Sequence, residues 1–378
     1  MRIGVNTRLL LHNKLEGIGR FTHELLSRMV AAHPEHEFYF FFDRPYHEEF
    51  IYGPNVRPVV LGPQARHPFL YNLFTDVAIP VALKKYKIDV YFSPDGLGTI
   101  RTSVPVLLAF HDLAFIHFPQ YISRLDKWHY NRFFPKYAHR ATHIVAVSEY
   151  TRQDLVTQYK IPEEKISVVY NGINAHYRPL DYDEKAEVKA RYTDGCEYFI
   201  FVSAIHPRKN VINLLKAFVK FKRFQKSRMK LVMVGRMAWQ TGEIEEVKTL
   251  MPYKEDVIWT GYLGIEELSR LMGAAYALVY PSFFEGFGIP IADALACNVP
   301  VITSSVSSMP EVGGEAALYV DPHSVEDIAA KLNFIYKDER LRDQLVANCR
   351  AQAAKFSWDH SAAQLWELLV YTAGQGKK

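Results

Sequence analysis

The stretch ALVYPSFFEGFGIPIADALA, residues 277–296, contains a short apolar run, a glycine turn and a second apolar segment. The run 277–282 is typical of a buried strand, and the glycines of the turn permit a close approach of the backbone to a bound group. Pro290 favours a helix start, because the first N–H of a helix has no partner within the helix. The stretch therefore predicts a strand, a turn and a helix, the repeating unit of a parallel sheet covered by helices.

Two carboxylates flank this turn. Glu285 precedes the predicted helix, and we expect Asp293 in its first turn. The N-terminus of a helix beside a glycine loop is a natural seat for phosphate. A carboxylate in the first turn is also a common partner of the helix dipole, so that structural role stays open for Asp293. Glu285, just before two glycines, is harder to explain as packing.

The rest of the chain repeats this alternation of strand and helix patterns. The predicted strands of the first half are residues 2–6, 37–42, 56–61, 88–92, 104–110, 143–147 and 166–170. Beyond the middle of the chain they are residues 198–203, 229–235, 257–261, 277–282, 299–304 and 316–320. Amphipathic helix patterns separate several of them, as at 18–30, 149–159 and 210–224. We therefore predict two doubly wound α/β domains joined near Asn174 to Asp183.

Length and composition agree with two globular domains. The 378 residues are 49% apolar and 23% charged, and the chain is too long for one hydrophobic core. The net charge of +4 is too small to indicate a nucleic-acid partner. No apolar run reaches the roughly 18 residues of a membrane span, and the N-terminus lacks an apolar signal core. We therefore expect a cytoplasmic protein.

The three cysteines are scattered along the chain and odd in number: Cys196, Cys297 and Cys349. This pattern fits a reducing compartment and offers no metal-ligand spacing. We expect all three to be small buried side chains.

Segments in both halves resemble those of one enzyme family. They are GIGRFTHELL (17–26), FHDLAF (110–115), VSEYTRQDL (147–155), VVYNGIN (168–174), IHPRKNVINLL (205–215), TGYLGIEEL (260–268) and PSFFEGFGIPIADALACNVPVITSSVSSMPEV (281–312). In this order they resemble the family-4 retaining glycosyltransferases of the GT-B fold. The family's pattern in the last segment is Glu, seven residues, Glu, whereas this chain has Glu285 and then Asp293.

The resemblance implies an α/β fold of two Rossmann-like doubly wound domains that face a central cleft. The first domain, residues 1–178, would lie on the acceptor side, and the second, residues 179–357, would bind a nucleotide-sugar donor. A C-terminal helix over residues 358–378 would cross back to the first domain. Ser357 is a candidate cap for this helix. Its apolar residues recur at helical spacing: Trp358, Ala362, Leu365, Trp366, Leu369 and Val370.

Arg208 and Lys209 follow the predicted strand 198–203 and match the family's phosphate clamp. In that role they would stabilise the negative charge that grows on the leaving diphosphate. Many relatives carry an arginine six residues before the lysine, where this chain has Ser203, and we expect Arg208 to supply that charge. The reaction would then need neither a divalent metal nor another cofactor.

The resemblance also assigns roles around the glycine turn. In the family the first acid contacts the transferred sugar and the second binds both ribose hydroxyls, which gives these roles to Glu285 and Asp293. Main-chain groups of the turn between them would meet hydroxyls and phosphate, at Gly286, Phe287, Gly288 and Ile289. The segment that often lines the base is matched by Tyr262 and Leu263.

The first half contributes His111, which follows the predicted strand 104–110 and matches a family histidine that touches the sugar. Gly17 and Gly19 match the glycine loop that closes over the donor phosphate and the acceptor. Taken alone, the segment GIGRFT is a poor phosphate fingerprint, because it lacks the third glycine. The assignment of the two glycines therefore depends on the resemblance.

Other functions fit parts of the sequence. An NAD-dependent oxidoreductase would explain the GIG segment and Asp43 in an N-terminal dinucleotide-binding domain, but it leaves the segments around Lys209 and Gly286 without a role. A non-catalytic carbohydrate-binding protein would need no phosphate clamp. The Asp-x-Asp of a metal-dependent transferase is matched by Asp181 to Asp183, inside the predicted linker.

The acceptor is the part that the sequence defines least. Between Arg101 and Arg140, six Lys or Arg stand against two Asp, and aromatic residues are interleaved with them: Phe115, Phe118, Trp128, Tyr130, Phe133 and Phe134. Such a face fits an anionic membrane, with the protein peripheral at the inner membrane face, or a lipid-linked diphosphate sugar. It fits equally well a helix with a core stripe and a solvated side.

We expect the acceptor to be a glycan or a lipid-linked saccharide in polysaccharide biosynthesis. From general similarity to mannosyltransferases, we expect the donor to be a nucleotide sugar, GDP-mannose. The base and sugar of the donor, the linkage and the oligomeric state are not readable from these residues.

Overall fold

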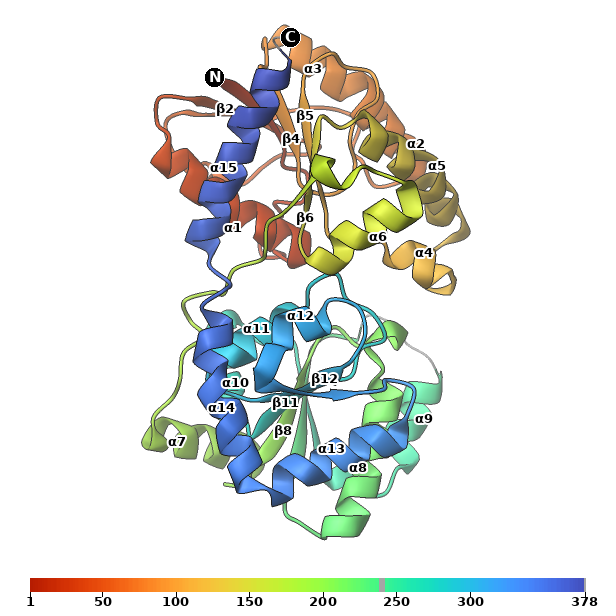
Figure 1. Ribbon diagram of the computed structural model, residues 1–378, viewed down its shortest axis with the longest axis vertical. Helices are drawn as coiled ribbons and strands as arrows, with labels where there is room; N and C mark the ends of the chain where they lie inside the picture. The colour runs from red at the N-terminus through yellow and green to blue at the C-terminus, as the bar shows by residue number, and fades with distance from the viewer. Residues whose placement is uncertain (238–241, 377–378) are drawn as a thin grey trace. The chain divides into compact units, whose positions relative to one another are not determined.

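The computed structural model describes residues 1–237 and 242–376, and the chain divides into two compact α/β units (Figure 1). Unit 1 is Met1–Gly172 with Ser357–Lys378, and unit 2 is Ile173–Phe356. The boundary that we expected after residue 178 lies in the same connecting segment as this division. That segment has no regular structure and ends where helix α7 (Tyr182–Thr193) begins.

Unit 1 contains a seven-stranded parallel sheet in the order β3-β2-β1-β4-β5-β6-β7. Its strands are β1 (Arg2–Asn6), β2 (Glu37–Phe42), β3 (Val56–Val60), β4 (Val90–Ser93), β5 (Val106–Phe110), β6 (His143–Ala146) and β7 (Ile166–Val168). All seven strands predicted for the first half are confirmed. The central strand β1 pairs with β2 and with β4, so Ile3 lies between Phe38 and Val90. The strand order reverses here, and ligands bind at such points in open α/β sheets.

The helices of unit 1 cover this sheet. They are α1 (Gly17–Ala32), η1 (Glu48–Phe50), α2 (Pro68–Leu73), η2 (Phe74–Ala78), α3 (Ile79–Lys85), α4 (Ala114–His117), η3 (Pro119–Tyr121), α5 (Arg124–Arg140), α6 (Glu149–Tyr159), η4 (Glu163–Lys165) and α15 (Trp358–Gln375). Three of them begin with a capping serine: Ser123 accepts from the Asp126 N–H, Ser148 from the Thr151 N–H, and Ser357 caps α15.

Unit 2 contains a six-stranded parallel sheet in the order β10-β9-β8-β11-β12-β13. Its strands are β8 (Tyr198–Val202), β9 (Lys230–Val234), β10 (Val257–Gly261), β11 (Ala277–Tyr280), β12 (Val301–Ser304) and β13 (Ala317–Val320). Every strand predicted for the second half is confirmed. Strand β8 lies between β9 and β11, so this sheet has its own reversal point.

The helices of unit 2 are α7, η5 (Pro207–Lys209), α8 (Val211–Gln225), α9 (Gly242–Leu250), η6 (Lys254–Asp256), α10 (Ile265–Gly273), α11 (Ile289–Ala296), α12 (Met309–Gly313), η7 (Gly314–Ala316), α13 (Val325–Lys337) and α14 (Glu339–Ala353). Helix α7 begins with a capping box between Asp181 and Glu184. The Asp181 to Asp183 segment is therefore explained as a helix start.

The C-terminal helix α15 belongs to unit 1, where it runs alongside α1 (Figure 1). Its start is capped by Ser357, which accepts from the His360 N–H. Arg28 pairs with Asp359 at 2.6 Å, and the ring of Trp366 stacks on His33 at 3.6 Å. The apolar residues that we expected to pack are mostly buried, although Val370 is exposed.

The burial of the aromatic side chains in residues 101–140 distinguishes a lipid-facing surface from a helix with a core stripe and a solvated side. Phe115 and Phe134 are buried, and three further aromatics are half-buried: Phe118, Tyr130 and Phe133. Trp128 alone of the six aromatics is exposed. The segment therefore consists mainly of core-packing residues with a basic outer side. Among the described residues, no helix is both long and apolar enough to cross a membrane.

The three cysteines lie in apolar surroundings. All are buried and free, as predicted. Burial raises the pKa of Cys349 to about 12. Burial also raises the pKa of Cys297, so the thiols of Cys297 and Cys349 are protonated at neutral pH and do not suit nucleophilic or metal-binding roles.

Candidate active site

The candidate site of unit 2 begins with the turn that follows β8. His206 caps the short helix η5 by accepting from the Arg208 N–H, which fixes the turn that carries Arg208 and Lys209. Asn210 ends the turn in the left-handed conformation, and its amide donates to the carbonyl oxygens of Pro281 (2.9 Å) and Pro322 (2.6 Å). The turn is thus tied to the segments that follow β11 and β13.

Glu285 lies beside this turn because β11 and β8 are neighbours in the sheet. It is 7% exposed, and its Oε1 accepts from Lys209 Nζ at 2.5 Å. The same oxygen accepts from Ser282 Oγ at 2.6 Å and from the Tyr280 hydroxyl at 2.9 Å. Arg208 Nη1 lies 3.5 Å from the other oxygen and also donates to the Phe284 carbonyl. The structure therefore brings together the predicted residues Glu285, Lys209 and Arg208.

This arrangement keeps Glu285 ionised. Burial by itself would raise the pKa of the carboxyl group, but the positive charges of Lys209 and Arg208, with hydrogen bonds from Lys209 and Ser282, outweigh it and lower the pKa to about 2. Tyr280 responds in the opposite sense, because burial and the nearby Glu285 raise the pKa of its hydroxyl well above the usual value. Tyr280 therefore stays a neutral donor to the carboxylate.

A set of serines that the sequence analysis did not single out supports the loop around Glu285. Ser308 Oγ donates to the carbonyl oxygens of Glu285 and Phe287, both at 2.9 Å. Ser307 Oγ accepts from the Glu285 N–H at 3.1 Å, and Ser304 Oγ donates to the Ser282 carbonyl at 2.7 Å. Their signal in the sequence is the run TSSVSS, residues 303–308, directly at the end of a strand.

The glycine turn leads into helix α11. Gly288 has φ = +102°, a conformation that side chains rarely adopt, which explains glycine at this position. Pro290 lies in the first turn of the helix, as predicted. Asp293, however, is the fifth residue of α11, and the first turn holds no acid. Our placement of Asp293 in the first turn was wrong, and a role as first-turn dipole partner is not available to this buried carboxylate.

The two residues predicted near the base lie in the loop between β10 and α10. Tyr262 is 76% exposed and Leu263 is half-buried. Their assignment remains a prediction, as do the roles of the main-chain groups from Gly286 to Ile289.

In unit 1, His111 follows β5 at the carboxyl edge of the sheet. Its Nε2 donates to the Pro94 carbonyl at 2.8 Å, and the Phe21 ring meets its face edge-on at 4.8 Å. Burial lowers the pKa of His111, against smaller opposing effects of the Pro94 carbonyl and Asp112. Neutral imidazole with a proton on Nε2 leaves Nδ1 as an acceptor.

Gly17 and Gly19 lie in the first turn of α1. A Cβ atom on Gly19 would lie 2.6 Å from the Leu9 carbonyl oxygen, so the loop from β1 needs glycine there for close packing. A Cβ atom on Gly17 would have nothing within 4 Å. Packing therefore explains Gly19 but leaves Gly17 unexplained.

A second polar group at this edge of unit 1 was missed. Asp95 Oδ2 accepts from Arg8 Nε at 2.5 Å, and its Oδ1 accepts from the Asn6 amide, the Ser93 hydroxyl and the Leu97 N–H, each at 3.1 Å. The carboxylate thus holds together the loops after β1 and β4. Asn6 and Arg8 are almost 90 residues from Asp95 in the sequence, so no local motif indicated this group.

Within residues 1–237 and 242–376, one surface group has ligand atoms at a spacing that suits a metal ion. His12, His47 and Glu49 each offer a ligand atom, and these atoms lie within 4.8 Å of one another. The two imidazole rings stack at 3.8 Å, and His12 Nδ1 lies 2.7 Å from Glu49. All three are exposed in unit 1 and belong to neither polar cluster described above. We assign them no part in the reaction.

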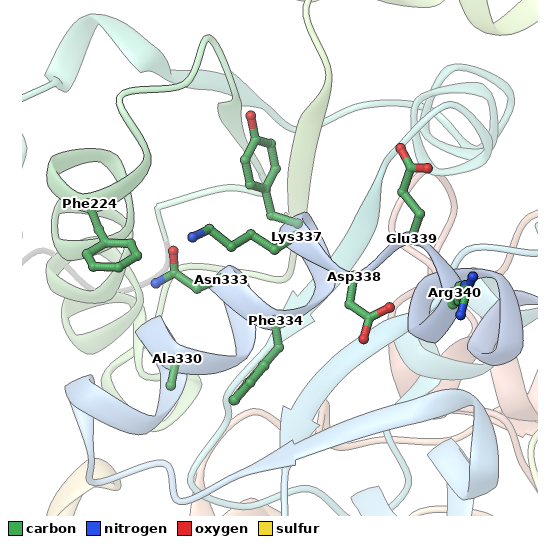
Figure 2. Close-up of a pocket in the computed structure, with 9 residues that line it drawn as sticks. Phe224, Ala330, Asn333, Phe334, Lys337, Asp338, Glu339 and Arg340 are labelled. Atoms are coloured by element: carbon green, nitrogen blue, oxygen red, sulfur yellow. The ribbon is translucent and has the colours of Figure 1, made fainter.

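A surface hollow of about 790 Å³ lies elsewhere on unit 2, lined by residues of α8, α13 and α14 (Figure 2). Lys337 extends toward the ring of Phe224, 5.1 Å away. The hydroxyl of Tyr276, just before β11, donates to the Ile335 carbonyl beside this hollow. The hollow therefore adjoins the amino ends of the strands and contains none of the candidate site residues.

Two family models match the chain, one over each unit. The model for glycosyltransferase family 4 matches residues 15–177, and the model for glycosyl transferases group 1 matches residues 183–352. The chain belongs to the family-4 glycosyltransferases of the GT-B fold. The alternatives of an NAD-dependent oxidoreductase and a non-catalytic carbohydrate-binding protein are set aside by this membership.

The relatives of this glycosyltransferase include bacterial polysaccharide enzymes. An O-antigen chain mannosyltransferase B of Escherichia coli is 28% identical over 93% of this chain and 94% of its own. An O-antigen chain mannosyltransferase of Salmonella typhimurium is 29% identical over 69% of each chain.

Among solved structures, the glycosyltransferase WaaG, involved in lipopolysaccharide biosynthesis, has a TM-score of 0.75 at 15% identity and covers 98% of this chain and 99% of its own. The Anabaena protein HepE with UDP and glucose has a TM-score of 0.74 at 17% identity, with the same coverage. These likenesses show the shared fold.

Proposed function

We propose that the protein transfers mannose from GDP-mannose to a glycan or lipid-linked saccharide, with retention of the anomeric configuration and without a divalent metal. The observation that carries this proposal is the buried group of Glu285, Lys209 and Arg208 at the carboxyl edge of the unit 2 sheet. The choice of mannose, and of polysaccharide biosynthesis as the process, is supported by the O-antigen chain mannosyltransferases among the relatives.

The proposal of metal independence is supported by the position of the positive charge. Arg208 and Lys209 are held in place by Glu285 and by the turn after β8, so they need no rearrangement to meet a diphosphate. Preorganised cations of this kind stabilise the charge that develops on a leaving phosphate group, which a divalent ion does in other transferases. The Asp-x-Asp letters of the chain are used in the α7 cap.

In this proposal Glu285 interacts with the sugar, whereas Arg208 and Lys209 interact with the diphosphate. Glu285 is ionised and accepts hydrogen bonds, so it suits the hydroxyl groups and partial positive charge of a sugar that is losing its leaving group. For His111, neutral and oriented by Pro94, we keep the role that the resemblance implies, contact with the transferred sugar.

A donor panel tests the proposal. Hydrolysis and transfer are measured with GDP-, UDP- and ADP-sugars, with and without a chelator, and the anomeric coupling of the product is determined by NMR. We expect GDP-mannose to react fastest, the chelator to have no effect, and the product to be α-linked. Preference for another sugar nucleotide, loss of turnover in the chelator with recovery in magnesium or manganese, or an inverted coupling would each contradict the corresponding part.

A further inference from the structure

Unit 1 exposes a row of large apolar side chains on the helical stretch from α2 to α3. Phe69, Leu73, Val77 and Val81 follow at intervals of four residues and are 62%, 45%, 44% and 63% exposed. Trp128 of α5 lies beside them, with its ring 6.3 Å from that of Phe69, and is 47% exposed. We call these five residues the apolar row. Single exposed apolar residues are ordinary, but an aligned set on adjacent helices marks an interaction surface.

Local backbone geometry explains the alignment. In a regular α-helix, residues four apart drift by about 40° around the axis at each step, because a turn takes 3.6 residues. Here the π-helical turn η2 lies between α2 and α3 and takes more residues per turn. Pro80 accounts for it, since proline has no N–H to bond to the Asp76 carbonyl. The wider turn offsets the drift and keeps Val77 and Val81 in line with Phe69 and Leu73.

The opposite side of this stretch is used by the core of unit 1. Phe74, Ile79 and Leu83 are buried in its hydrophobic cluster. The neighbouring helix α5 is fixed to α2 by the 2.9 Å hydrogen bond between His129 and Asn72. The apolar row is therefore the exposed side of the stretch from α2 to α3, and α2 and α5 are neighbours in the ribbon (Figure 1).

The surroundings of the row are strongly basic. Residues 66–87 and 124–140 contain nine Lys or Arg and two Asp. Asp76 is buried and accepts from the Ile100 N–H and the Thr99 hydroxyl, and Asp126 is engaged at the start of α5. The exposed cations include Lys84 and Lys85, at the end of α3, and Lys127, next to Trp128.

We propose that the apolar row and its basic rim dock unit 1 on an anionic phospholipid surface. Apolar side chains flanked by Lys and Arg, with a tryptophan among them, are the features of helices that lie in a membrane interface. A second copy of the chain is a poorer partner, because two positive rims would repel each other. The stretch from Phe69 to Val81 lies outside residues 101–140, the segment first considered for membrane contact, whereas Trp128 and the cations of α5 lie inside it. The proposal does not depend on the identity of the donor.

Vesicle sedimentation of the full chain tests the proposal. We expect binding to vesicles that contain phosphatidylglycerol with phosphatidylcholine, little binding to phosphatidylcholine alone, and weakening by salt. The double variant Phe69→Ser, Val81→Ser should bind at least tenfold more weakly, and Lys84→Glu, Lys85→Glu should lose the preference for anionic vesicles. The matched control is Phe224→Ser, Phe334→Ser, two comparably exposed apolar residues of unit 2, which should bind like the unchanged protein.

Each variant alters exposed side chains, so melting curves should agree with the unchanged protein, and hydrolysis of a soluble donor should be retained. Equal vesicle binding by the Phe69→Ser, Val81→Ser variant and the unchanged protein overturns the proposal. So does failure of the unchanged protein to bind anionic vesicles. If it instead self-associates in sedimentation velocity, and the Phe69→Ser, Val81→Ser variant does not, the row is a contact between copies and the lipid assignment is wrong.

Discussion

The carboxyl edges of the two sheets differ in the charge of the predicted site residues that they hold. In unit 2, Glu285 is ionised between Lys209 and Arg208 and accepts from several donors. In unit 1, His111 is held by one carbonyl oxygen and one aromatic edge, and burial keeps it neutral. The edge of unit 2 therefore holds a carboxylate with two cations, whereas the edge of unit 1 holds a neutral imidazole and, separately, the Arg8–Asp95 ion pair.

Because of this difference in charge, we expect the two edges to suit different parts of a sugar nucleotide. Fixed cations fit a diphosphate, whose charge grows as the glycosidic bond breaks. A neutral acceptor nitrogen fits hydroxyl groups, which carry no formal charge. The contrast between the units can be tested through their stability, through the catalytic rate and through nucleotide binding.

The largest effect should come from deleting residues 357–378, which removes α15 and its cap Ser357. Trp358, Leu365 and Leu369 are buried in unit 1, and fully burying each such side chain contributes roughly 1.5–3 kcal/mol. Their combined loss is comparable with the whole stability of a domain, about 5–15 kcal/mol. Unit 1 should therefore unfold while unit 2 keeps its structure. Hydrogen exchange resolved by segment measures this, and protection of unit 1 equal to that of the full chain would contradict the placement of the helix.

The sequence predicted the fold well because both sheets are buried on both faces. Apolar runs such as 37–42 and 198–203 stand out from the amphipathic segments around them, and all the predicted strands are present. It could not place Asp293 correctly, because a proline indicates the start of a helix without fixing its first residue. Helix α11 begins at Ile289, one residue before Pro290, so Asp293 is the fifth residue. Nor could the sequence reveal the Asp95 cluster, whose partners Asn6 and Arg8 are brought close only by the pairing of β1 with β4.

The second prediction concerns Glu285→Gln. Removing the carboxylate charge should lower kcat by about 10²–10³-fold, the usual effect of losing one preorganised electrostatic group. Affinity for the bare nucleoside diphosphate should not fall, because Arg208 and Lys209 keep their charge. Single-turnover kinetics and calorimetry separate the two quantities. A variant that loses diphosphate affinity but keeps kcat would assign Glu285 to the nucleotide instead of the transferred sugar.

The third prediction concerns the pH dependence of stability that His129, a buried histidine of unit 1, produces. Burial lowers the pKa of His129 from 6.5 to about 4, against the smaller effect of Asp126. The unfolded chain therefore binds a proton more readily than the folded one, so this contribution is complete above pH 6.5 and is lost as the pH falls toward 4. The shift corresponds to roughly 3 kcal/mol.

The contribution of Glu285 to stability is also lost as the pH falls, but over a lower pH range, from the ordinary pKa of 4.5 down to about 2. Unit 1 should thus lose protection at a higher pH than unit 2. Hydrogen exchange between pH 7 and 4 compares the units, and His129→Gln should flatten the loss in unit 1. An unchanged pH profile in that variant would show that His129 is not the group responsible.

The smallest effect is expected for substitutions of Asp293. They test whether this carboxylate of unit 2 binds the ribose or has a purely structural role. If Asp293 accepts the two ribose hydroxyls, each charge-assisted hydrogen bond is worth roughly 1.5–3 kcal/mol. Asp293→Ala should then weaken binding of the nucleoside diphosphate at least tenfold, since about 1.4 kcal/mol corresponds to that factor. Asp293→Glu restores the residue common in the family and should keep most of the affinity.

Because Asp293 is buried in α11, a melting curve must first establish that the alanine variant is folded. Calorimetry with GDP then decides between the two roles. A folded Asp293→Ala protein that binds GDP as tightly as the unchanged chain would limit this acid to packing. It would also leave Lys209 and Arg208 as the groups that hold the nucleotide, so the contrast between the two sheet edges would rest on the cations alone.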